Sequence, residues 1–339
     1  MSTNTPLPRI AVIGTGGTIS SVGRHNLELV EYITLKRKYD VHELLARVPE
    51  ADRVANVVPI PYAAVSSTSI EPGNWLELNE RIHSLVEEDP DLDGIVLTHG
   101  TATLEETAYF LGLTLKVDRP VVVTGAQRPA SALSTDAFLN IVNALRVAGS
   151  EAARGLGVLV MLNDEIHAAR EVAKTSTQRL QTFRTPDFGA LGQADADGVN
   201  IYRHPVRRRA PDTEFDVRGT AADELPRVDV SLSYAGADGT DIDAYVAAGA
   251  KGIVVAGFAP GLNTKGQVAA IERAHEEGVV LVQSSRVGSG RVPPLAGDQQ
   301  LPDPVVADNL TPWKARILLM LGLRESQDRD ELRRMFATY

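Results

Sequence analysis

Residues 12–20 read VIGTGGTIS, and residues 98–107 read THGTATLEET. In each stretch an apolar, β-branched run stops and a threonine beside glycine follows: Thr18 in the first, Thr101 in the second. Open parallel α/β sheets carry their chemistry where strands end in this way. A hydroxyl presented on glycine-flanked backbone can approach a carbonyl carbon without steric obstruction. We therefore predict a hydrolase with a threonine nucleophile on an α/β sheet.

The sequence around these motifs alternates short apolar strands with amphipathic helices. Continuous apolar runs predict buried parallel strands, and apolar residues at steps of three or four predict helices. Thr103 and Glu106 form a candidate capping box at the start of one helix. The predicted strands are Ile10–Ile13, Gly94–Leu97, Val121–Thr124 and Gly157–Leu162, and the predicted helices are Trp75–Glu88, Thr103–Val117 and Thr135–Ala148. This alternation predicts a doubly wound sheet.

A change of composition divides the chain. Residues 205–226 are rich in Pro, Asp and Arg and lack periodicity, which is typical of a linker. We predict an N-terminal α/β domain at 1–204, a linker at 205–226 and a smaller C-terminal α/β domain at 227–339. The elements expected in the last are strands at Val228–Leu232, Gly252–Ala256 and Val279–Gln283, and helices at Asp241–Ala248, Lys265–Glu276, Pro312–Leu321 and Asp328–Ala337.

The composition of the 339 residues excludes several functions. There are 34 Lys and Arg against 44 Asp and Glu, a net charge of −10, so we expect no nucleic-acid partner. Cysteine is absent, which excludes disulfides, thiolate metal ligands and a cysteine nucleophile. Neither a metal-ligand spacing nor a membrane-length apolar stretch occurs, and the first nine residues lack the order of a secretory signal. We expect a cytoplasmic protein with a small-molecule substrate and no membrane partner.

Other interpretations of the first motif are weaker. A dinucleotide-binding fingerprint would need glycine at its third position, where Ile19 stands, so a nucleotide-binding oxidoreductase is disfavoured. His99 is predicted to be a hydrogen-bonded structural residue. Lys174 is the preferred candidate base, and it can act as one only if desolvation or a nearby cation lowers its pKa. A lysine in a loop is otherwise solvated surface.

Taken together, these residues resemble the bacterial L-asparaginases and glutaminase-asparaginases. The matching blocks are TGGTIS at 15–20, HGTATLEETAYFL at 99–111, PVVVTGAQRP at 120–129, Asn163-Asp164 with Lys174-Thr175, and Ser284–Arg286. The resemblance implies a two-domain asparaginase-like α/β fold. It also implies a homotetramer of intimate dimers with active sites between subunits, and double displacement without a metal or organic cofactor.

The resemblance also assigns roles by position. Thr18 corresponds to the nucleophile that forms the acyl-enzyme, and Tyr32 to its activating partner on a flexible lid. Thr101 corresponds to the second threonine, and Lys174 to the base that acts through it. Ser67 matches the serine that binds the substrate's α-carboxylate. The remaining positions expected in the substrate site are Gly17, Thr68, Gly100 and Ala102.

Three positions depart from the family pattern, all around the substrate's α-amine. Ala102 stands where the family has an Asp that pairs with the α-ammonium; losing a desolvated charge partner costs about 2–5 kcal/mol. Pro260 stands where the family usually has an Asn that reaches across the dimer, and Gly288–Leu301 lacks the Glu that supplies a second acid. We therefore predict an amide, lactam, lactone or ester substrate whose acid part lacks an α-ammonium.

Two alternatives stay open. One is weak asparaginase activity in which another acid, such as Asp136, binds the ammonium. The other is a non-catalytic homologue that binds a metabolite, although binding alone would not need Thr18, Thr101 and Lys174.

Overall fold

The apolar runs of the N-terminal part become neighbours in one eight-stranded sheet with the order β10-β9-β6-β5-β4-β3-β1-β2. Strands β2, β1, β3, β4 and β5 pair in parallel, and β6, β9 and β10 continue the sheet antiparallel. The strands are β1 (Arg9–Gly16), β2 (Asn56–Val65), β3 (Gly94–Thr98), β4 (Val121–Thr124), β5 (Val158–Leu162), β6 (Glu165–Ala168), β9 (Gly192–Asp195) and β10 (Gly198–Ile201). The four strands predicted from apolar runs are present and parallel. A separate pair joins β7 (Ala173–Lys174) to β8 (Phe183–Arg184).

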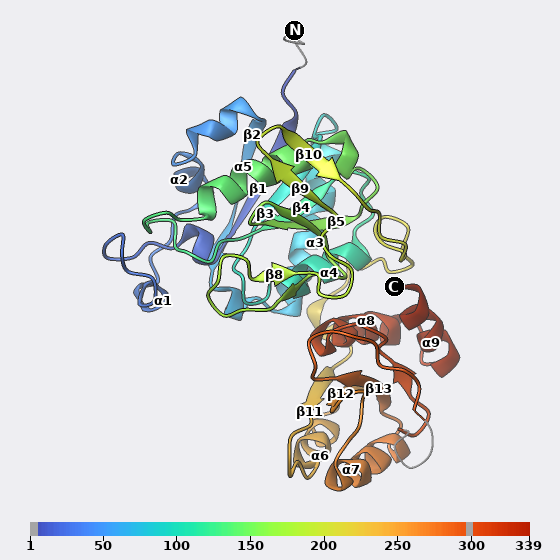
Figure 1. The fold of residues 1–339 in the computed structure, drawn as a ribbon. Helices are drawn as coiled ribbons and strands as arrows, with labels where there is room; N and C mark the ends of the chain where they lie inside the picture. The colour runs from blue at the N-terminus through green and yellow to red at the C-terminus, as the bar shows by residue number, and fades with distance from the viewer. Residues whose placement is uncertain (1–5, 296–300) are drawn as a thin grey trace. The chain divides into compact units, whose positions relative to one another are not determined.

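This computed structural model describes residues 6–295 and 301–339. The chain forms two units, Met1–Arg218 and Gly219–Tyr339 (Figure 1). Residues 1–5 of the N-terminal sequence and residues 296–300 of the Gly288–Leu301 stretch lie outside the described residues. Within the described ranges, no helix has both the length and the apolar character needed to cross a membrane.

The sequence did not predict β2 or the antiparallel strands. Pro59 and Pro61 break the apolar run of β2, and proline is tolerated there because β2 is the last strand of the sheet. The turn from β5 to β6 passes through Asn163 and Asp164, whose φ angles are 52° and 65°. An Asn-Asp pair with positive φ is typical of a tight hairpin turn, so this dipeptide was the available signal for β6.

Helices cover both faces of the large sheet (Figure 1). The core beneath α5 joins Ile141 and Leu145 to Val96 and Val122 of the sheet. At α4 the predicted capping box is wrong: the Glu106 N–H donates to the Thr103 carbonyl oxygen at 3.1 Å and not to its hydroxyl, which itself donates to the Ser67 carbonyl oxygen at 2.8 Å. The helices of this unit are α1 (Tyr32–Leu35), α2 (Val41–Leu45), α3 (Pro72–Glu88), α4 (Leu104–Thr114) and α5 (Ala137–Ala148).

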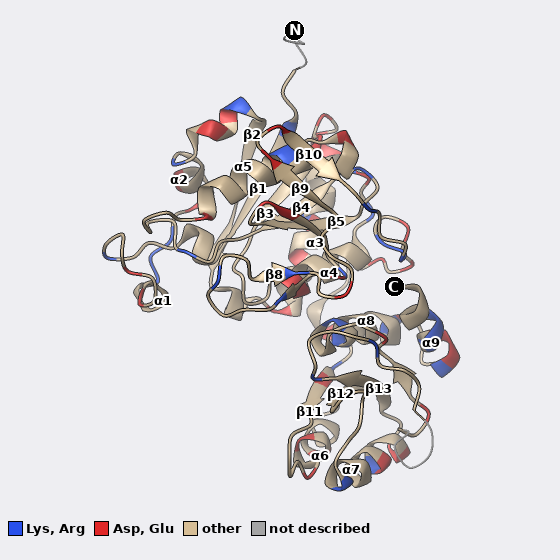
Figure 2. Cartoon of the chain, viewed as in Figure 1, with Lys and Arg blue, Asp and Glu red and all other residues tan. Residues whose placement is uncertain are grey.

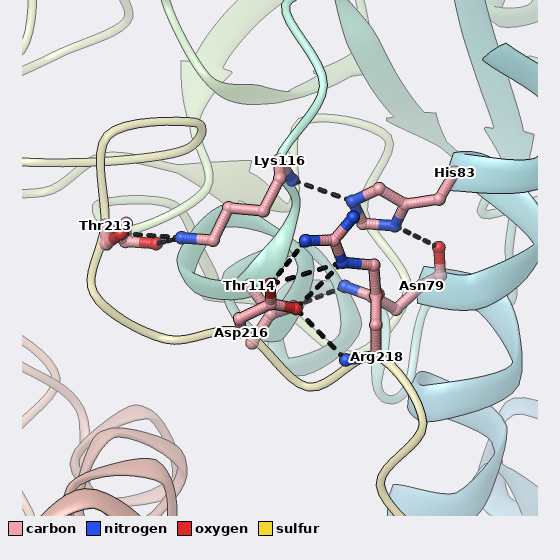
Figure 3. A network of polar contacts seen from close by, with 7 residues as sticks. All are labelled: Asn79, His83, Thr114, Lys116, Thr213, Asp216 and Arg218. Carbon is pink, nitrogen blue, oxygen red and sulfur yellow. Dashed lines mark hydrogen bonds and ion pairs between the residues drawn. The ribbon is translucent and has the colours of Figure 1, made fainter. Parts of the chain in front are cut away.

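The segment that enters the predicted linker is fastened to this unit by polar contacts (Figure 3). Lys116 Nζ donates to the carbonyl and hydroxyl oxygens of Thr213, at 2.6 and 2.8 Å. The backbone N–H of Lys116 donates to His83 Nε2 at 3.0 Å. Arg218 pairs with Asp216 and lowers the pKa of that carboxyl to about 2. The contacts of Lys116 hold the chain to the N-terminal unit at Thr213, and the pair of Arg218 with Asp216 is local to the segment.

The C-terminal unit is a parallel four-stranded sheet with the order β11-β12-β13-β14. All three strands and all four helices predicted for this part are present; the two-residue strand β14 was not predicted. The elements are β11 (Val228–Leu232), β12 (Gly252–Gly257), β13 (Val280–Ser285), β14 (Val305–Val306), α6 (Thr240–Ala247), α7 (Lys265–Glu276), α8 (Pro312–Glu325) and α9 (Arg329–Thr338).

Candidate active site

The two threonine motifs touch each other through their glycines. Strands β1 and β3 are parallel neighbours, so their carboxyl ends meet at one edge of the sheet. Gly17 has a φ of 81°, and a Cβ on it would lie 2.1 Å from the Cα of Gly100. Only glycine allows this backbone contact, because a side chain would meet both a clash and an unfavourable φ. Gly17 and Gly100 therefore bring the Thr18 and Thr101 loops together.

Thr18 is paired with a tyrosine. It begins a short 3₁₀ turn directly after β1, and its Oγ1 lies 3.1 Å from the hydroxyl oxygen of Tyr32. Burial raises the pKa of Tyr32 against the opposing effect of this hydrogen bond, and the charges of Glu28 and Asp136 raise it further. The phenol is therefore protonated at neutral pH and can donate or relay a proton.

Thr101 is paired with Lys174. Lys174 ends β7, and Thr101 lies in the loop after β3. The amine Nζ of Lys174 donates to Thr101 Oγ1 at 2.8 Å. Burial lowers the pKa of Lys174, and the negative charge of Glu105 partly opposes this shift. Glu105 also accepts a hydrogen bond from the backbone N–H of Lys174 at 3.2 Å. A half-buried lysine with a lowered pKa is more readily the neutral amine that a base must be.

Ser67 joins the same edge from β2. It is 8% exposed and begins a 3₁₀ turn after that strand. Its Oγ accepts a hydrogen bond from the backbone N–H of Ala102 at 3.2 Å, and a Cβ on Gly100 would lie 2.6 Å from it. Thr68 next to it is exposed, with its hydroxyl 3.0 Å from that of Ser66. Ala102 is exposed and brings no charge to the site.

His99 is a structural residue, as the sequence predicted. Its side chain is fully buried, and burial lowers its pKa to about 4, so the ring is neutral at pH 7. Nδ1 donates to the Gly100 carbonyl at 2.8 Å, and Nε2 accepts from the Thr107 hydroxyl at 3.0 Å. That hydroxyl also accepts from Trp75 Nε1 at 2.9 Å. The chain of bonds from Trp75 to Gly100 fixes the loop that carries Thr101.

Asp136, the alternative acid for an ammonium, is hydrogen-bonded to the backbone of the loop at residues 127–128. Its carboxylate accepts the backbone N–H groups of Gln127 and Arg128, each at 2.9 Å, and Asn140 Nδ2 at 3.3 Å. Pro260 belongs to the C-terminal unit and is exposed there. Within 6–295 and 301–339, no group of three or more His, Asp or Glu side chains is arranged to hold a metal ion.

Three contributors to this region were missed from sequence: Glu28, Glu105 and Thr107. Glu105 and Thr107 lie inside the second motif, so their position beside Thr101 was the available signal. Glu28 lies in an irregular segment without periodicity, and nothing in the sequence singles it out.

Family models and known proteins match the chain over nearly its whole length. An "Asparaginase, N-terminal" model matches residues 9–207, and a "Glutaminase/Asparaginase C-terminal domain" model matches residues 227–336. A glutaminase-asparaginase of Pseudomonas fluorescens biotype A is 39% identical over 343 residues, covering 100% of this chain and 92% of that protein. L-asparaginase 2 of Bacillus subtilis is 41% identical, covering 98% of this chain and 87% of that protein.

A solved structure shares the fold. The crystal structure of a probable cytoplasmic L-asparaginase from Campylobacter jejuni superposes with a TM-score of 0.92 at 36% sequence identity. The match covers 98% of this chain and 100% of that one. The arrangement of a large mixed sheet followed by a small parallel sheet is thus shared along the chain.

Proposed function

Because the chain belongs to the asparaginase family, whose members are amidohydrolases with a threonine nucleophile, we propose that Thr18 is its nucleophile in the hydrolysis of a small linear amide. One observation carries this assignment of residues. Thr18 contacts Tyr32, and Thr101 contacts a lysine whose pKa is lowered by burial, on two loops that touch through Gly17 and Gly100.

The proposed reaction has two displacements. In the first, Thr18 Oγ1 bonds to the amide carbon and the C–N bond breaks. The leaving nitrogen takes the proton that the Thr18 hydroxyl gives up, relayed by the Tyr32 hydroxyl. The product is an ester between the acyl group and Thr18.

In the second displacement water attacks this ester. The neutral amine of Lys174 takes the water's proton through Thr101, and the proton returns to the Thr18 oxygen as the acid leaves. The balance is amide plus water giving a carboxylic acid and ammonia or an amine. Neither step requires a metal or an organic cofactor.

Ser67 is proposed to bind the carboxylate of the substrate. Its Oγ accepts the N–H of Ala102, so its own O–H proton is directed elsewhere and can be donated to an anion. Gly17, Thr68, Gly100 and Ala102 are proposed to line the same site. Thr68 would use the hydroxyl that now lies beside Ser66.

A second candidate concerns the substrate's amine. Ala102 is exposed next to Ser67 and offers a methyl group where an acid would be needed to pair with an α-ammonium. We propose that the acid part of the substrate carries no α-ammonium, so that a succinamate-like amide, a lactone or an ester fits better than L-asparagine. The alternative remains L-asparagine or L-glutamine, as the names of the relatives would indicate.

The assembly and location are also proposals. Apolar side chains lie exposed on the segment around α1, which supports coverage by another copy of the chain in a homotetramer of intimate dimers. They are Leu27 (69% exposed), Leu29 (47%), Val30 (62%) and Ile33 (64%). In Figure 2 the Lys and Arg residues are interspersed with Asp and Glu, which supports the absence of a nucleic-acid partner. A cytoplasmic location is supported by the name of the Campylobacter jejuni structure.

A substrate panel tests the proposal. L-asparagine, L-glutamine, succinamate, a lactone and a simple ester are each incubated with the wild-type protein and with Thr18→Ala. We expect turnover by the wild type, loss of turnover in Thr18→Ala, and a higher kcat/KM for succinamate than for L-asparagine. Efficient L-asparagine turnover would contradict the proposed substrate class. Thermal stabilisation by these compounds without any product would instead indicate a metabolite-binding protein.

A further inference from the structure

A buried carboxylate lies in the segment that carries Tyr32. Glu28 is only 8% exposed, although the residues on either side of it are exposed. Its Oε1 accepts two backbone N–H groups, from Tyr32 at 2.8 Å and from Val30 at 3.0 Å. Figure 1 shows this segment, with α1, projecting from the body of the N-terminal unit.

We propose that Glu28 is a positioning residue, whose buried carboxylate holds Tyr32 where its hydroxyl meets that of Thr18. Only the expected effect of Glu28 on turnover rests on the proposed function. The contact itself is part of the fold and can be tested without any substrate.

The helix α1 depends on this carboxylate. It has only four residues, and its N-cap Glu31 makes no side-chain cap bond. The backbone N–H of Tyr32 is one of the donors that a helix start leaves without an intrahelical partner, and Glu28 accepts it. A hydrogen bond to an ionised acceptor is stronger than one to a neutral oxygen, so it suits a short helix without other support.

The second oxygen of Glu28 is unusual. Among the described residues, Oε2 is buried and has no hydrogen-bond partner. Gly23 packs against it, and a Cβ on Gly23 would lie 2.5 Å from it. Burying a charged oxygen without a hydrogen-bond partner costs free energy. The charge itself therefore requires an explanation.

That explanation is the electrostatic effect on Tyr32. Three groups act on the phenol: the Thr18 hydroxyl, and the carboxylates of Glu28 and Asp136. Both negative charges disfavour the phenolate and raise the pKa of Tyr32. Glu28 thus fixes the position of Tyr32 through Oε1 and helps to keep its proton in place through its charge.

Two hydrogen bonds tie the segment to residues 131–133 before Glu28 is reached. The N–H of Gly23 donates to Ser131 Oγ at 2.8 Å, and the N–H of Leu133 donates to the carbonyl of Asn26 at 2.8 Å. Both ties lie before Glu28 in the chain. His25 Nδ1 accepts the N–H of Leu27 at 3.3 Å, and after Leu27 the Glu28 carboxylate is the side chain that accepts backbone donors as far as Tyr32.

Two variants separate the tie from the charge. Glu28→Ala removes both, whereas Glu28→Gln keeps an oxygen that can accept the two N–H groups. The matched control is Glu31→Ala, because Glu31 is 64% exposed at its side chain and is paired only at 3.4 Å with Arg24. Such an exposed pair contributes little.

The first readout is hydrogen exchange of the Val30 and Tyr32 amides. We expect Glu28→Ala to speed their exchange about tenfold or more, the loss expected for charge-assisted hydrogen bonds. Glu28→Gln keeps a neutral acceptor and should speed exchange less than Glu28→Ala does, and Glu31→Ala should stay close to the wild type. The second readout is kcat and KM on whichever amide the wild type hydrolyses, where Glu28→Ala should lower kcat about tenfold or more and leave KM nearly unchanged.

The third readout isolates the charge. In Glu28→Gln, the absorbance titration of Tyr32, taken as the difference from Glu28→Gln with Tyr32→Phe, should move to lower pH than in the wild type. A side chain with a purely structural role would not move this titration.

A double-mutant cycle tests the contact with Gly23. Gly23→Ala alone should displace Oε2 and speed the same amides, whereas adding it to Glu28→Ala should have little further effect, because Oε2, the atom nearest to the new Cβ, is then absent. Wild-type exchange and kcat in Glu28→Ala, with a loss in Tyr32→Phe, would overturn the proposal. If Thr18→Ala kept full activity the proposed function would fail, and the exchange result would still decide the role of Glu28.

Discussion

Thr107→Val removes one hydroxyl that serves two partners and leaves the shape of the side chain unchanged. Thr107 is fully buried, accepts from Trp75 Nε1 at 2.9 Å and donates to His99 Nε2 at 3.0 Å. The substitution therefore leaves two buried polar groups without a partner. Each costs about 1–3 kcal/mol, so the free energy of unfolding should fall by about 2–6 kcal/mol. Because His99 also holds the Gly100 carbonyl, kcat should fall as well.

Urea unfolding followed by tryptophan fluorescence measures this change. The chain has two tryptophans, and Trp313→Phe in both proteins makes Trp75 the reporter of the N-terminal unit. Thr34→Val is the matched control, because the Thr34 hydroxyl is exposed and donates only to the Glu31 carbonyl. A loss below about 0.5 kcal/mol in Thr107→Val, equal to that of the control, would refute the reasoning.

Three further outcomes follow from the site. Ala102→Asp should raise kcat/KM for L-asparagine relative to succinamate, and an unchanged ratio would show that this position does not select against the amine. The rate should rise with pH as Lys174 loses its proton, at a pH below the usual lysine pKa. Glu105→Gln should move this rise in rate to lower pH, because the charge of Glu105 raises the pKa of Lys174. His99 binds a proton at its ordinary pKa when unfolded and only near pH 4 when folded, so the free energy of unfolding should fall by about 3 kcal/mol as pH drops from about 6.5 to 4. The exposed His204→Gln should show the same fall as the wild type, and loss of the fall in that variant would contradict its assignment to His99.

The parallel strands and most helices could be predicted because each has a local cause. Val121–Thr124 and Gly94–Thr98 are continuous apolar runs, and Lys265–Glu276 begins at a capping box made by Thr264 and Gln267. The strand β2 could not be predicted, because two prolines break its pattern and its edge position is a property of the assembled sheet. Ser67 follows β2 directly, so without a prediction of that strand it could be assigned only by resemblance.

The threonine motifs predicted where chemistry would occur but not how the groups are paired. The proximity of Gly17 and Gly100 depends on the adjacency of β1 and β3. The contact between Lys174 and Thr101 depends on the turn at Asn163-Asp164, where the chain reverses from β5 into the antiparallel β6 before it reaches Lys174. The wrong capping box at Thr103 has a similar origin: the hydroxyl donates to the Ser67 carbonyl, which the fold brings near, and the Glu106 N–H that a cap would use donates to the Thr103 carbonyl instead.

The assignment of Thr18 as the nucleophile is tested most directly by the mass of the protein quenched during turnover of succinamate. We expect the mass of the acyl group to be added to the wild-type protein and located on the peptide that contains Thr18, with no addition in Thr18→Ala. Undiminished turnover by Thr18→Ala, or an acyl group on a different residue, would contradict the mechanism.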